Sequence, residues 1–388
     1  MIKLRDVASY VSEKVDIGFL KEKEYITTDN MISNRGGIII SNSLPRGDKV
    51  TKFERGDILV SNIRPYFKKI WYATFNGGCS NDVIVFRSNG INSKFLYYVL
   101  SQNVFFDYMM SAANGTKMPR GNKKLIPEFE FPNYSSVQQE HISSILSTFD
   151  YLIENNQKQI KLLEEAAQRL YKEWFIDLRF PGHENIEIVD GVPEGWHINR
   201  ADHYFKITIG KTPSRAEKQW FTNSGEGTPW ISISDMGEAG AFAFYSKEDL
   251  TADAIVRHNM KVVPKGSVLV SFKLTVGRVV ITGVDMCTNE AIAHFYIDND
   301  LDRAYAYCYL NNFEYDSLGN TSSISKAINS KIIKSMPFIM PTRNILKRFS
   351  MIVQPILDQI EFKQKMIFRL TEARDRLLPK LMSGEIEV

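Results

Sequence analysis

Two long stretches of the chain carry seam residues at alternating spacings of four and three. The first stretch runs through Ile142, Leu146, Phe149, Ile153, Asn156, Ile160, Leu163, Ala167, Leu170 and Trp174. The second runs through Phe349, Val353, Ile356, Ile360, Lys363, Ile367, Leu370, Arg374, Leu377 and Leu381. This spacing predicts two helices, each with a narrow apolar seam of about four heptads. Asn156 and Lys363 interrupt the seams at matching places, and such polar residues weaken packing but fix register.

The rest of the chain alternates short apolar runs with turns, and the runs occur in two matching sets. "GDILVS" (56–61) matches "GSVLVS" (266–271), and a loop with basic residues follows each of these expected strands. Further on, "CSNDVIVF" (79–86) matches "CTNEAIAHF" (287–295). The chain is therefore predicted to be an internal repeat of the α+β class, in which each half is a mixed α/β globule followed by a helix.

This repeat divides the chain into five predicted segments. They are a first globular domain (1–135), a central helix (136–179), a loop-rich linker (180–199), a second globular domain (200–344) and a C-terminal helix (345–388). The two helices can pair in either direction, or each can pack on its own globule. We favour pairing, because long and narrow seams are typical of coiled coils.

Charge is unevenly distributed between these segments. Residues 1–135 hold 19 Lys and Arg against 13 Asp and Glu, whereas residues 136–195 hold 5 against 11. The first globule is thus basic, which is compatible with an acidic partner or with ordinary solvated surface. The three cysteines are scattered, which argues against disulfides and zinc and favours a reducing cytoplasm. The sequence has no apolar run of about 18 residues, the length that a membrane-spanning helix needs.

The sequence lacks a familiar catalytic pattern. "ITIGKTPS" (207–214) contains Gly-Lys-Thr, but Phe205 occupies the position where a phosphate-binding loop needs its first glycine. The six histidines form no H-E-x-x-H motif. We therefore expect no catalytic residue, metal or cofactor in this chain.

Several motifs together resemble the DNA-specificity subunit of type I restriction–modification enzymes. They are "GKTPS" (210–214), "TPWISISDM" (228–236), "CTNEAIAHF", "SMPFIMP" (335–341), "GVPEGW" (191–196), "LLPKLMSGEIEV" (377–388), and "NIRPYFKKIW" with "CSNDVIVF". The resemblance covers essentially the whole chain in the right order.

This resemblance implies a prokaryotic, cytoplasmic and non-catalytic protein in which each globule is a target-recognition domain. Each domain would read one half of a bipartite duplex DNA site. The helices would pair antiparallel, set the gap between half-sites and dock two copies of a methyltransferase subunit, and a nuclease/translocase subunit would join the complex. S-adenosylmethionine, ATP and magnesium would belong to those partners.

A duplex reader needs Lys and Arg to hold phosphates and polar side chains to read bases. We expect the contacts in the loops after the matching strands and in the later loops of each globule. For the first domain the candidates are Arg64, Tyr66, Lys68, Lys69, Lys117, Arg120, Asn122, Lys123 and Lys124. For the second they are Lys211, Lys273, Arg278, Ser323, Ser325, Lys326 and Lys331.

Two other functions remain open at this point. One is a protein–protein scaffold whose paired helices join two partners without reading DNA. The other is a fused restriction enzyme with its own active site, which the missing motifs disfavour.

Overall fold

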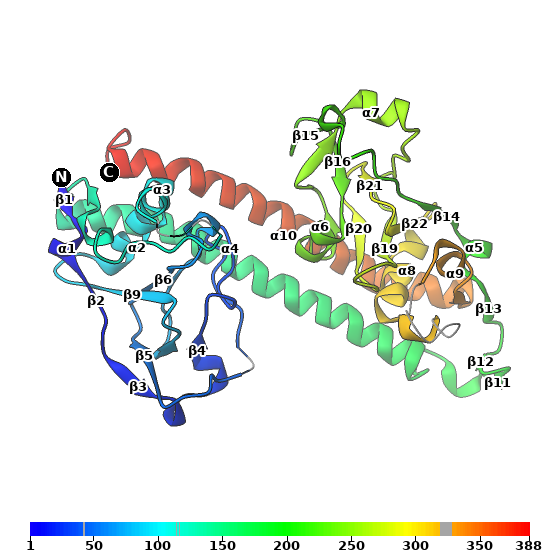
Figure 1. Ribbon diagram of the computed structural model, residues 1–388. Coiled ribbons are helices and arrows are strands. Elements are labelled where there is room, and N and C mark those ends of the chain that lie inside the picture. Colours follow the sequence, from blue (N-terminus) through cyan, green and yellow to red (C-terminus); the bar gives the residue numbers. More distant parts are fainter. Residues whose placement is uncertain (42, 114, 116, 319–327) are drawn as a thin grey trace. The chain divides into compact units, whose positions relative to one another are not determined.

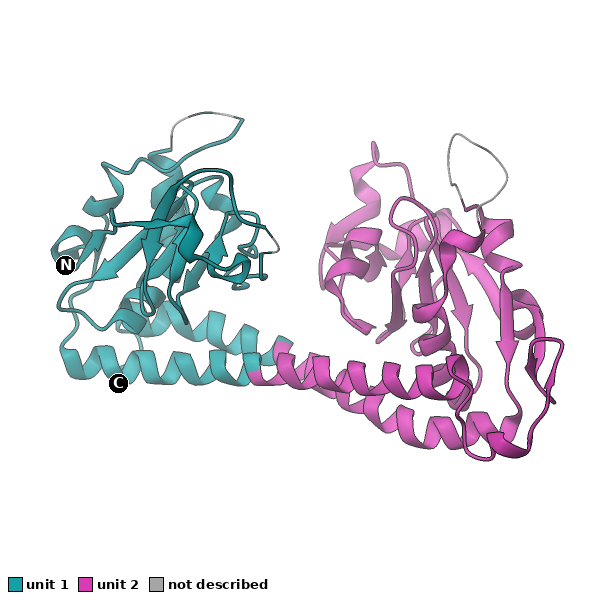
Figure 2. Cartoon of the chain, turned by 90° about the horizontal axis from the view of Figure 1, so that it is seen from below, with its two compact units in different colours: residues 1–154, 368–388 teal, residues 155–367 magenta. Residues whose placement is uncertain are grey.

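The computed structural model describes residues 1–388 except 42, 114, 116 and 319–327 (Figure 1). The chain divides into two compact units, which are coloured separately in Figure 2. Unit 1 comprises residues 1–154 and 368–388, and unit 2 comprises residues 155–367. Each unit thus combines one globule with a segment of each long helix.

Unit 1 contains two four-stranded sheets. Its strands are β1 (Ile2–Lys3), β2 (Ala8–Tyr10), β3 (Lys14–Asp16), β4 (Tyr25–Ile26), β5 (Lys49–Phe53), β6 (Ile58–Ser61), β7 (Ile70–Tyr72), β8 (Gly77–Cys79), β9 (Val83–Ser88) and β10 (Glu130–Phe131). Its helices are α1 (Leu4–Val7), α2 (Ser93–Ser101), α3 (Asn103–Ser111), the first part of α4 (Ser136–Tyr171) and the last part of α10 (Arg343–Ser383). The strand orders are β2-β9-β6-β7 and β3-β5-β8-β4.

Unit 2 contains a five-stranded and a four-stranded sheet. Its strands are β11 (Ile188–Val189), β12 (Val192–Pro193), β13 (His197–Arg200), β14 (Lys206–Ile209), β15 (Phe221–Asn223), β16 (Thr228–Ile231), β17 (Phe242–Ala243), β18 (Glu248–Leu250), β19 (Val268–Ser271), β20 (Val279–Thr282), β21 (Cys287–Thr288), β22 (Ile292–Tyr296) and β23 (Pro337–Met340). Its helices are the last part of α4, α5 (Ala201–Tyr204), α6 (Ile233–Glu238), α7 (Ala252–Arg257), α8 (Asp300–Asn312), α9 (Ser330–Lys334) and most of α10 (Arg343–Ser383). The strand orders are β14-β22-β19-β20-β17 and β15-β18-β16-β21.

The two central sheets share one topology. The order β2-β9-β6-β7 in unit 1 corresponds to β14-β22-β19-β20 in unit 2, with β6 and β19 formed by the matching "ILVS" and "VLVS" runs. A parallel strand pair also recurs, with Ile26 opposite Cys79 and Trp230 opposite Cys287. The smaller sheets differ elsewhere, since β5 pairs with the cysteine strand β8 whereas β18 pairs with β16.

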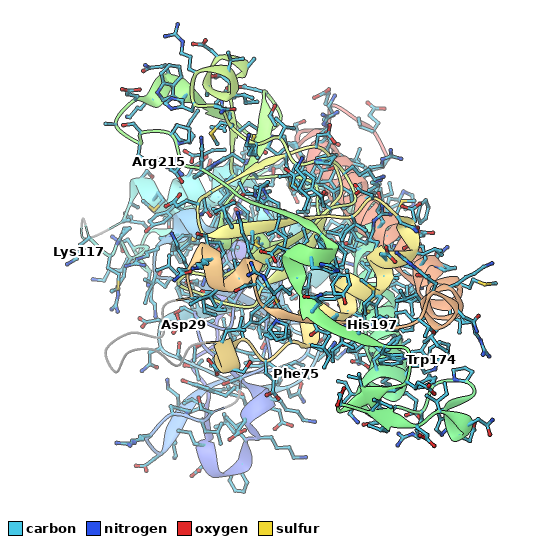
Figure 3. All side chains as sticks on the ribbon, turned by 90° about the vertical axis from the view of Figure 1, so that its right-hand side faces the viewer. Asp29, Phe75, Lys117, Trp174, His197 and Arg215 are labelled. Atoms are coloured by element: carbon cyan, nitrogen blue, oxygen red, sulfur yellow. The ribbon has the colours of Figure 1, made fainter. Side chains whose placement is uncertain are left out.

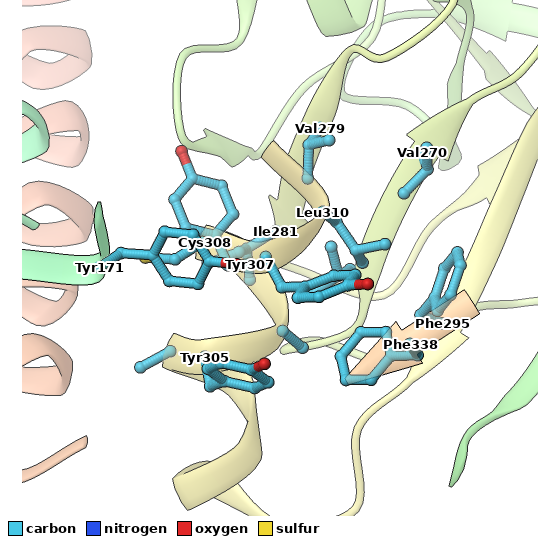
Figure 4. Close-up of a cluster of buried hydrophobic side chains, with 14 of the residues drawn as sticks. Tyr171, Val270, Val279, Ile281, Phe295, Tyr305, Tyr307, Cys308, Leu310 and Phe338 are labelled. Atoms are coloured by element: carbon cyan, nitrogen blue, oxygen red, sulfur yellow. The ribbon is translucent and has the colours of Figure 1, made fainter. Parts of the chain in front are cut away.

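The central strands are buried on both faces. Alternate residues of a strand point to opposite sides of its sheet. In unit 1, Ile58 and Val60 face the cluster that contains α2, α3 and the long helices, whereas Leu59 faces the second sheet. In unit 2, Val268 and Val270 face the apolar cluster that includes Tyr305 and Leu310 of α8 (Figure 4).

The segments of α4 and α10 contact each other within each unit. In unit 1, Arg374 of α10 contacts Asp150 of α4 at 2.7 Å, and the Tyr134 hydroxyl donates to the Leu381 carbonyl at 3.2 Å. The lower-numbered residue of the first segment, Tyr134 just before α4, lies beside the higher-numbered residue of α10, Leu381. The two segments therefore run antiparallel. In unit 2, the Trp174 ring just beyond α4 packs on Phe349 near the start of α10.

The most buried helix positions deviate from the expected seam. Leu357 and Leu378 are buried, whereas the predicted seam residues next to them, Ile356 and Leu377, are half-buried. A straight helix has 3.6 residues per turn, so its buried face drifts from a strict seven-residue repeat. The globules also pack on these helices, which widens the buried stripe beyond a narrow seam. Helix α10 continues through Pro355 and Pro379.

Arg374, a charged residue of the predicted seam, lies between α4 and α10 in unit 1. Its side chain is only 12% exposed, and its partner Asp150 also accepts a hydrogen bond from the Tyr98 hydroxyl at 2.5 Å. Each of the two charges therefore has a partner within the protein.

We predict that Arg374→Ala lowers the unfolding free energy of unit 1 by about 2 kcal/mol, between the values of exposed and fully buried pairs. The loss arises because Asp150 loses the guanidinium that pairs with it in this buried contact. Urea unfolding of the full chain measures the effect. Arg376→Ala is the matched control, since Arg376 is 78% exposed and pairs with Glu372 on the helix surface. Equal destabilisation by both variants would contradict this role for Arg374.

Candidate nucleic-acid interface

The loop that follows β6 is closed at its base by a buried serine. Ser61 donates its backbone N–H to the Lys69 carbonyl at 3.0 Å and its hydroxyl to the Ile63 carbonyl at 3.0 Å. Within the loop, Arg64 and Lys68 adopt left-handed backbone angles, with φ of 49° and 51°. Such angles cost energy for residues other than glycine and cluster at functional sites.

Three loops of the first domain meet here, and we call residues 33–36, 62–69 and 117–124 the first loop cluster. Arg64 donates its N–H to the Pro119 carbonyl at 2.8 Å, and Gly121 donates to the Asn62 carbonyl at 3.1 Å. Arg35 donates its N–H to the Lys68 carbonyl at 3.0 Å. The structure therefore brings together the two basic stretches that the sequence analysis had singled out separately.

The predicted side chains of the first loop cluster fall into two groups. Lys68 donates to Asn103 at 2.9 Å, Lys69 donates to the Thr28 carbonyl at 2.7 Å, and Arg120 pairs with Asp82 at 3.1 Å. These three cations therefore have partners within the protein. The second group is more open to solvent or incompletely bonded.

In that second group, Lys117 (labelled in Figure 3), Lys123 and Lys124 are exposed. The Tyr66 ring is 46% exposed and lies 4.6 Å from the Phe67 ring. Arg64 is half-buried, and in the part of the chain that the structure describes its Nε has no hydrogen-bond partner. The Asn122 amide oxygen accepts the Lys124 N–H at 3.0 Å, which stabilises the turn that carries the two lysines.

The loop after β19 is closed by the equivalent serine, Ser271. Its N–H donates to the Arg278 carbonyl at 3.0 Å, and its carbonyl accepts the Gly277 N–H at 2.9 Å. Its hydroxyl donates to the Thr275 carbonyl at 2.6 Å and accepts the Arg278 N–H at 3.0 Å. The chain ends of the loop are thus fixed, while Lys273 at its outer part is exposed.

This loop belongs to a second loop cluster, defined as residues 210–212, 272–278 and 288–290. Lys211 donates its N–H to the Thr288 carbonyl at 3.0 Å, and Thr212 donates its hydroxyl to Glu290. Gly210 lies so close to the backbone of Thr288 and Asn289 that a side chain would collide with it. The glycine of Gly-Lys-Thr therefore serves loop packing here.

The other predicted residues of the second domain occupy varied places. The Arg278 guanidinium donates to the Ile233 carbonyl and lies against Gly237, so it anchors α6. Lys211 reaches the His258 and Asn259 carbonyls at 3.4 Å. Lys331 is exposed on α9. Ser323, Ser325 and Lys326 lie outside the described residues.

The sequence analysis also missed two carboxylates, Asp82 beside the first loop cluster and Glu290 within the second. Asp82 and Glu290 are the fourth residues of "CSND" and "CTNE", and both lie beside predicted cations. The Thr212 hydroxyl lowers the pKa of Glu290, so this group is ionised at neutral pH. Carboxylates can accept a hydrogen bond from the cytosine amino group. Aligning the two repeats would have pointed to this pair.

A further basic feature of unit 2 also escaped the sequence analysis. Arg215 (labelled in Figure 3) lies over the Phe221 and Trp230 rings, 4.3 and 4.6 Å from their centroids. It borders a polar hollow of about 530 Å³ that Lys218 and Lys247 also line. Arg215 pairs with Glu248, so much of its charge is already balanced.

A buried histidine is hydrogen-bonded to a residue of the second loop cluster. His294 of β22 is hydrogen-bonded through Nδ1 to Thr208 of β14 at 2.8 Å and through Nε2 to Thr288 of β21 at 2.6 Å. Burial lowers the pKa of His294 to about 3. The imidazole is therefore neutral and links three strands, β14, β21 and β22, through its two hydrogen bonds.

The described residues contain no group of three or more histidine, cysteine or acidic side chains that could hold a metal ion. Cys79 and Cys287 are both buried, and burial raises the pKa of each thiol to about 12. In the same described ranges, no helix has the length and apolar character needed to cross a membrane.

Comparison with known proteins identifies the class of this fold. The chain resembles the crystal structure of the type I restriction–modification S subunit from M. genitalium with a TM-score of 0.60 and 16% identity, covering 98% of this chain and 95% of that chain. The family model described as "Type I restriction modification DNA specificity domain" matches residues 1–165 and 193–372. The chain therefore belongs to the type I restriction–modification DNA specificity family, and the resemblance seen in the sequence is confirmed.

Curated relatives are similar over most of their length. The MjaIX specificity subunit of Methanocaldococcus jannaschii is 27% identical over 404 residues, covering 96% of this chain and 87% of that protein. The HindI specificity subunit of Haemophilus influenzae is 25% identical over 468 residues, covering 99% and 98%.

The buried histidine predicts a pH dependence of stability. The pKa of about 3 in the folded chain lies below the ordinary value of 6.5, so the unfolded chain binds this proton first. The contribution of His294 is complete above pH 6.5 and is lost as the pH falls toward 3. Between pH 7 and pH 5, the unfolding free energy of wild-type unit 2 should fall by about 2 kcal/mol more than that of His294→Gln. Urea unfolding at both pH values measures this difference, and identical pH dependence would contradict it.

The exposed lysines of the first loop cluster predict a salt effect on DNA binding. If they neutralise phosphates, Lys123→Ala or Lys124→Ala should weaken duplex binding for many sequences and reduce the slope of log K against log salt by roughly 0.9. Titrations of the assembled complex at several salt concentrations measure this slope. Lys161→Ala removes an exposed lysine from α4 instead and serves as the matched control. If the loop variants keep the wild-type slope, these lysines do not contact phosphates.

Proposed function

We propose that this chain is the sequence-reading subunit of a type I restriction–modification complex, in which each globular domain reads one half of a bipartite duplex site. The observation that carries the proposal is the repeated loop element: β6 and β19 each end in a buried serine that closes a loop with basic residues. Family membership supports DNA as the ligand.

The chemistry of the two loop clusters supports different half-sites. The first cluster combines Tyr66 with several lysines and arginines, whereas the second combines Lys273 with Thr212 and Glu290. Cations hold the phosphate backbone, while hydroxyl, amide and carboxylate groups distinguish base edges. Two domains with unlike polar groups would read unlike sequences, so the complete site would be asymmetric.

In this proposal, α4 and α10 pair as an antiparallel coiled coil and set the distance between the half-sites. The contacts of Asp150 with Arg374 and of Trp174 with Phe349 support pairing in each unit. The helices would also dock two methyltransferase subunits. Exposed apolar side chains offer contact area for such partners, among them Tyr151, Leu162, Met351 and Phe362. A nuclease/translocase subunit would join the full complex.

Catalysis would reside in these partner subunits, together with S-adenosylmethionine, ATP and magnesium. A scaffold that joins proteins without reading DNA is the competing function. It predicts that the assembled complex binds duplexes without sequence preference and with a shallow salt dependence, because few phosphate counterions would be released.

The spacer role predicts the effect of inserting one heptad into each helix. Seven residues inserted after Glu154 and seven after Ile367 keep the apolar stripe in phase and lengthen the pair by about 10 Å. Half-sites one duplex turn apart are separated by about 34 Å for about 10 base pairs. The gap in the recognised site should therefore grow by at most about three base pairs, with the bases of both half-sites unchanged. Mapping of methylated adenines in DNA exposed to the reconstituted methyltransferase measures the gap.

An insertion of two residues at the same two places is the control. It turns the following stripe by about 200° at about 100° per residue, so the helices should no longer pack and assembly should fail. An active heptad variant with the wild-type gap would refute the spacer role. A wild-type map without two separated half-sites would refute the proposed function itself.

A further inference from the structure

Leu274 has an unusual position in the second loop cluster. Its side chain is 96% exposed, the highest value among the exposed large apolar residues of the described chain. Its backbone is left-handed, with a φ of 59°, which is disfavoured for a branched side chain. Glycine would adopt this backbone without that cost, and the exposed leucine side chain adds almost nothing to the packing of the fold.

The same position of the first domain carries the same backbone feature. Arg64 is the third residue after Ser61, and Leu274 is the third residue after Ser271. Both have left-handed backbones, with φ of 49° and 59°. The flanking bonds also correspond, because Asn62 donates to the Asp82 carbonyl at 2.8 Å and Phe272 donates to the Ala291 carbonyl at 2.9 Å.

The base of the loop that carries Leu274 is fixed by hydrogen bonds. Four hydrogen bonds fix the backbone and hydroxyl of Ser271 to residues 275–278, and the Phe272 side chain is only 1% exposed. Residues 273–275 are exposed beyond this anchor. Lys273 lies beside Leu274 and provides a cation for a phosphate.

We propose that Leu274 is a specificity-determining residue that contacts the 5-methyl group of a thymine in the major groove, an assignment that rests on the proposed DNA-reading function. Arg64, at the equivalent position, has the side chain that most often reads guanine in that groove. Leu274 can neither donate nor accept a hydrogen bond. The thymine methyl is the apolar feature that the major-groove base edges offer to such a side chain.

This assignment differs from that of an apolar wedge between base steps. Wedge residues enter the minor groove and kink the duplex. Leu274 is followed by Thr275 and by half-buried Val276. The equivalent residue of the first domain is Arg64, whose charged side chain would not serve as an apolar wedge. A thymine contact accounts for both residues at one position, with arginine in one domain and leucine in the other.

The test uses the full chain assembled with its methyltransferase subunits and compares wild type with Leu274→Gly. Glycine adopts the left-handed backbone without strain, so assembly and melting temperature should stay unchanged. Mapping of methylated sites should show one A·T position of a single half-site becoming degenerate. The other half-site and the gap should not change.

Deoxyuridine supplies an atomic readout, because it differs from thymidine only by the missing methyl group. At the degenerate position, replacing thymine with uracil should slow methylation by wild type about fourfold, the value of one buried methyl group. Leu274→Gly should methylate both duplexes at equal rates. A wild-type enzyme that is insensitive to uracil at every thymine of the half-site would overturn the proposal.

Two further variants keep the result interpretable. Asp190→Gly, at another exposed left-handed residue of unit 2, should leave every preference unchanged. Leu274→Asn, which also tolerates this backbone, should shift the preference at the same single position. If Leu274→Gly keeps all base preferences while wild type shows a bipartite site, the thymine contact is wrong and the proposed function stands. If wild type shows no bipartite site, the proposed function has failed first.

Discussion

The central sheet of each unit has no face that can be left in water. Ile58, Leu59 and Val60, like Val268, Leu269 and Val270, are all buried, so each sheet needs an apolar cover on both sides. A second sheet covers one side, and helices cover the other. The long helices α4 and α10 each contribute a segment to both units. Removing either helix would therefore expose apolar surface in two places.

This cover leaves the ends of the central strands as the places where side chains can vary. The serine at each strand end uses its backbone and hydroxyl to close the loop, and outer residues such as Tyr66 and Leu274 remain exposed. The two loops have accordingly diverged in character, to Arg64-Pro65-Tyr66 in one and Leu274-Thr275-Val276 in the other. A similar base with a different outer part in each domain fits the proposal that the two domains read different half-sites.

The sequence was informative wherever burial dictates a repeating pattern. The strands at 58–61 and 268–271 and the helices at 136–171 and 343–383 follow from apolar runs and spacings. The exact buried face of α10 did not follow, because the globules add contacts that a heptad pattern does not contain. Leu357 thus replaces Ile356 as the most buried residue at that turn.

Loop chemistry was much less predictable. A count of cations could not show that Arg278 turns inward to the Ile233 carbonyl, or that residues 62–64 hydrogen-bond to residues 119–121. These contacts join segments far apart in the sequence, and no periodicity encodes them. Asp82, Glu290 and Leu274 were not among the candidates because the sequence analysis selected Lys, Arg, Tyr, Asn and Ser side chains, whereas carboxylates and apolar side chains can also contact base edges.

The discontinuous composition of unit 1 has a consequence for how the protein is made. Leu378, Leu381 and Met382 are part of the same apolar core as Ile142 and Leu146. A ribosome must therefore synthesise residues 155–367 before the last side chains of unit 1 become available. At roughly 5–20 residues per second, this interval lasts about 10 to 40 s. During that time the nascent first globule exposes an apolar helix face, which makes it a natural client for chaperones that shield such surfaces until translation ends.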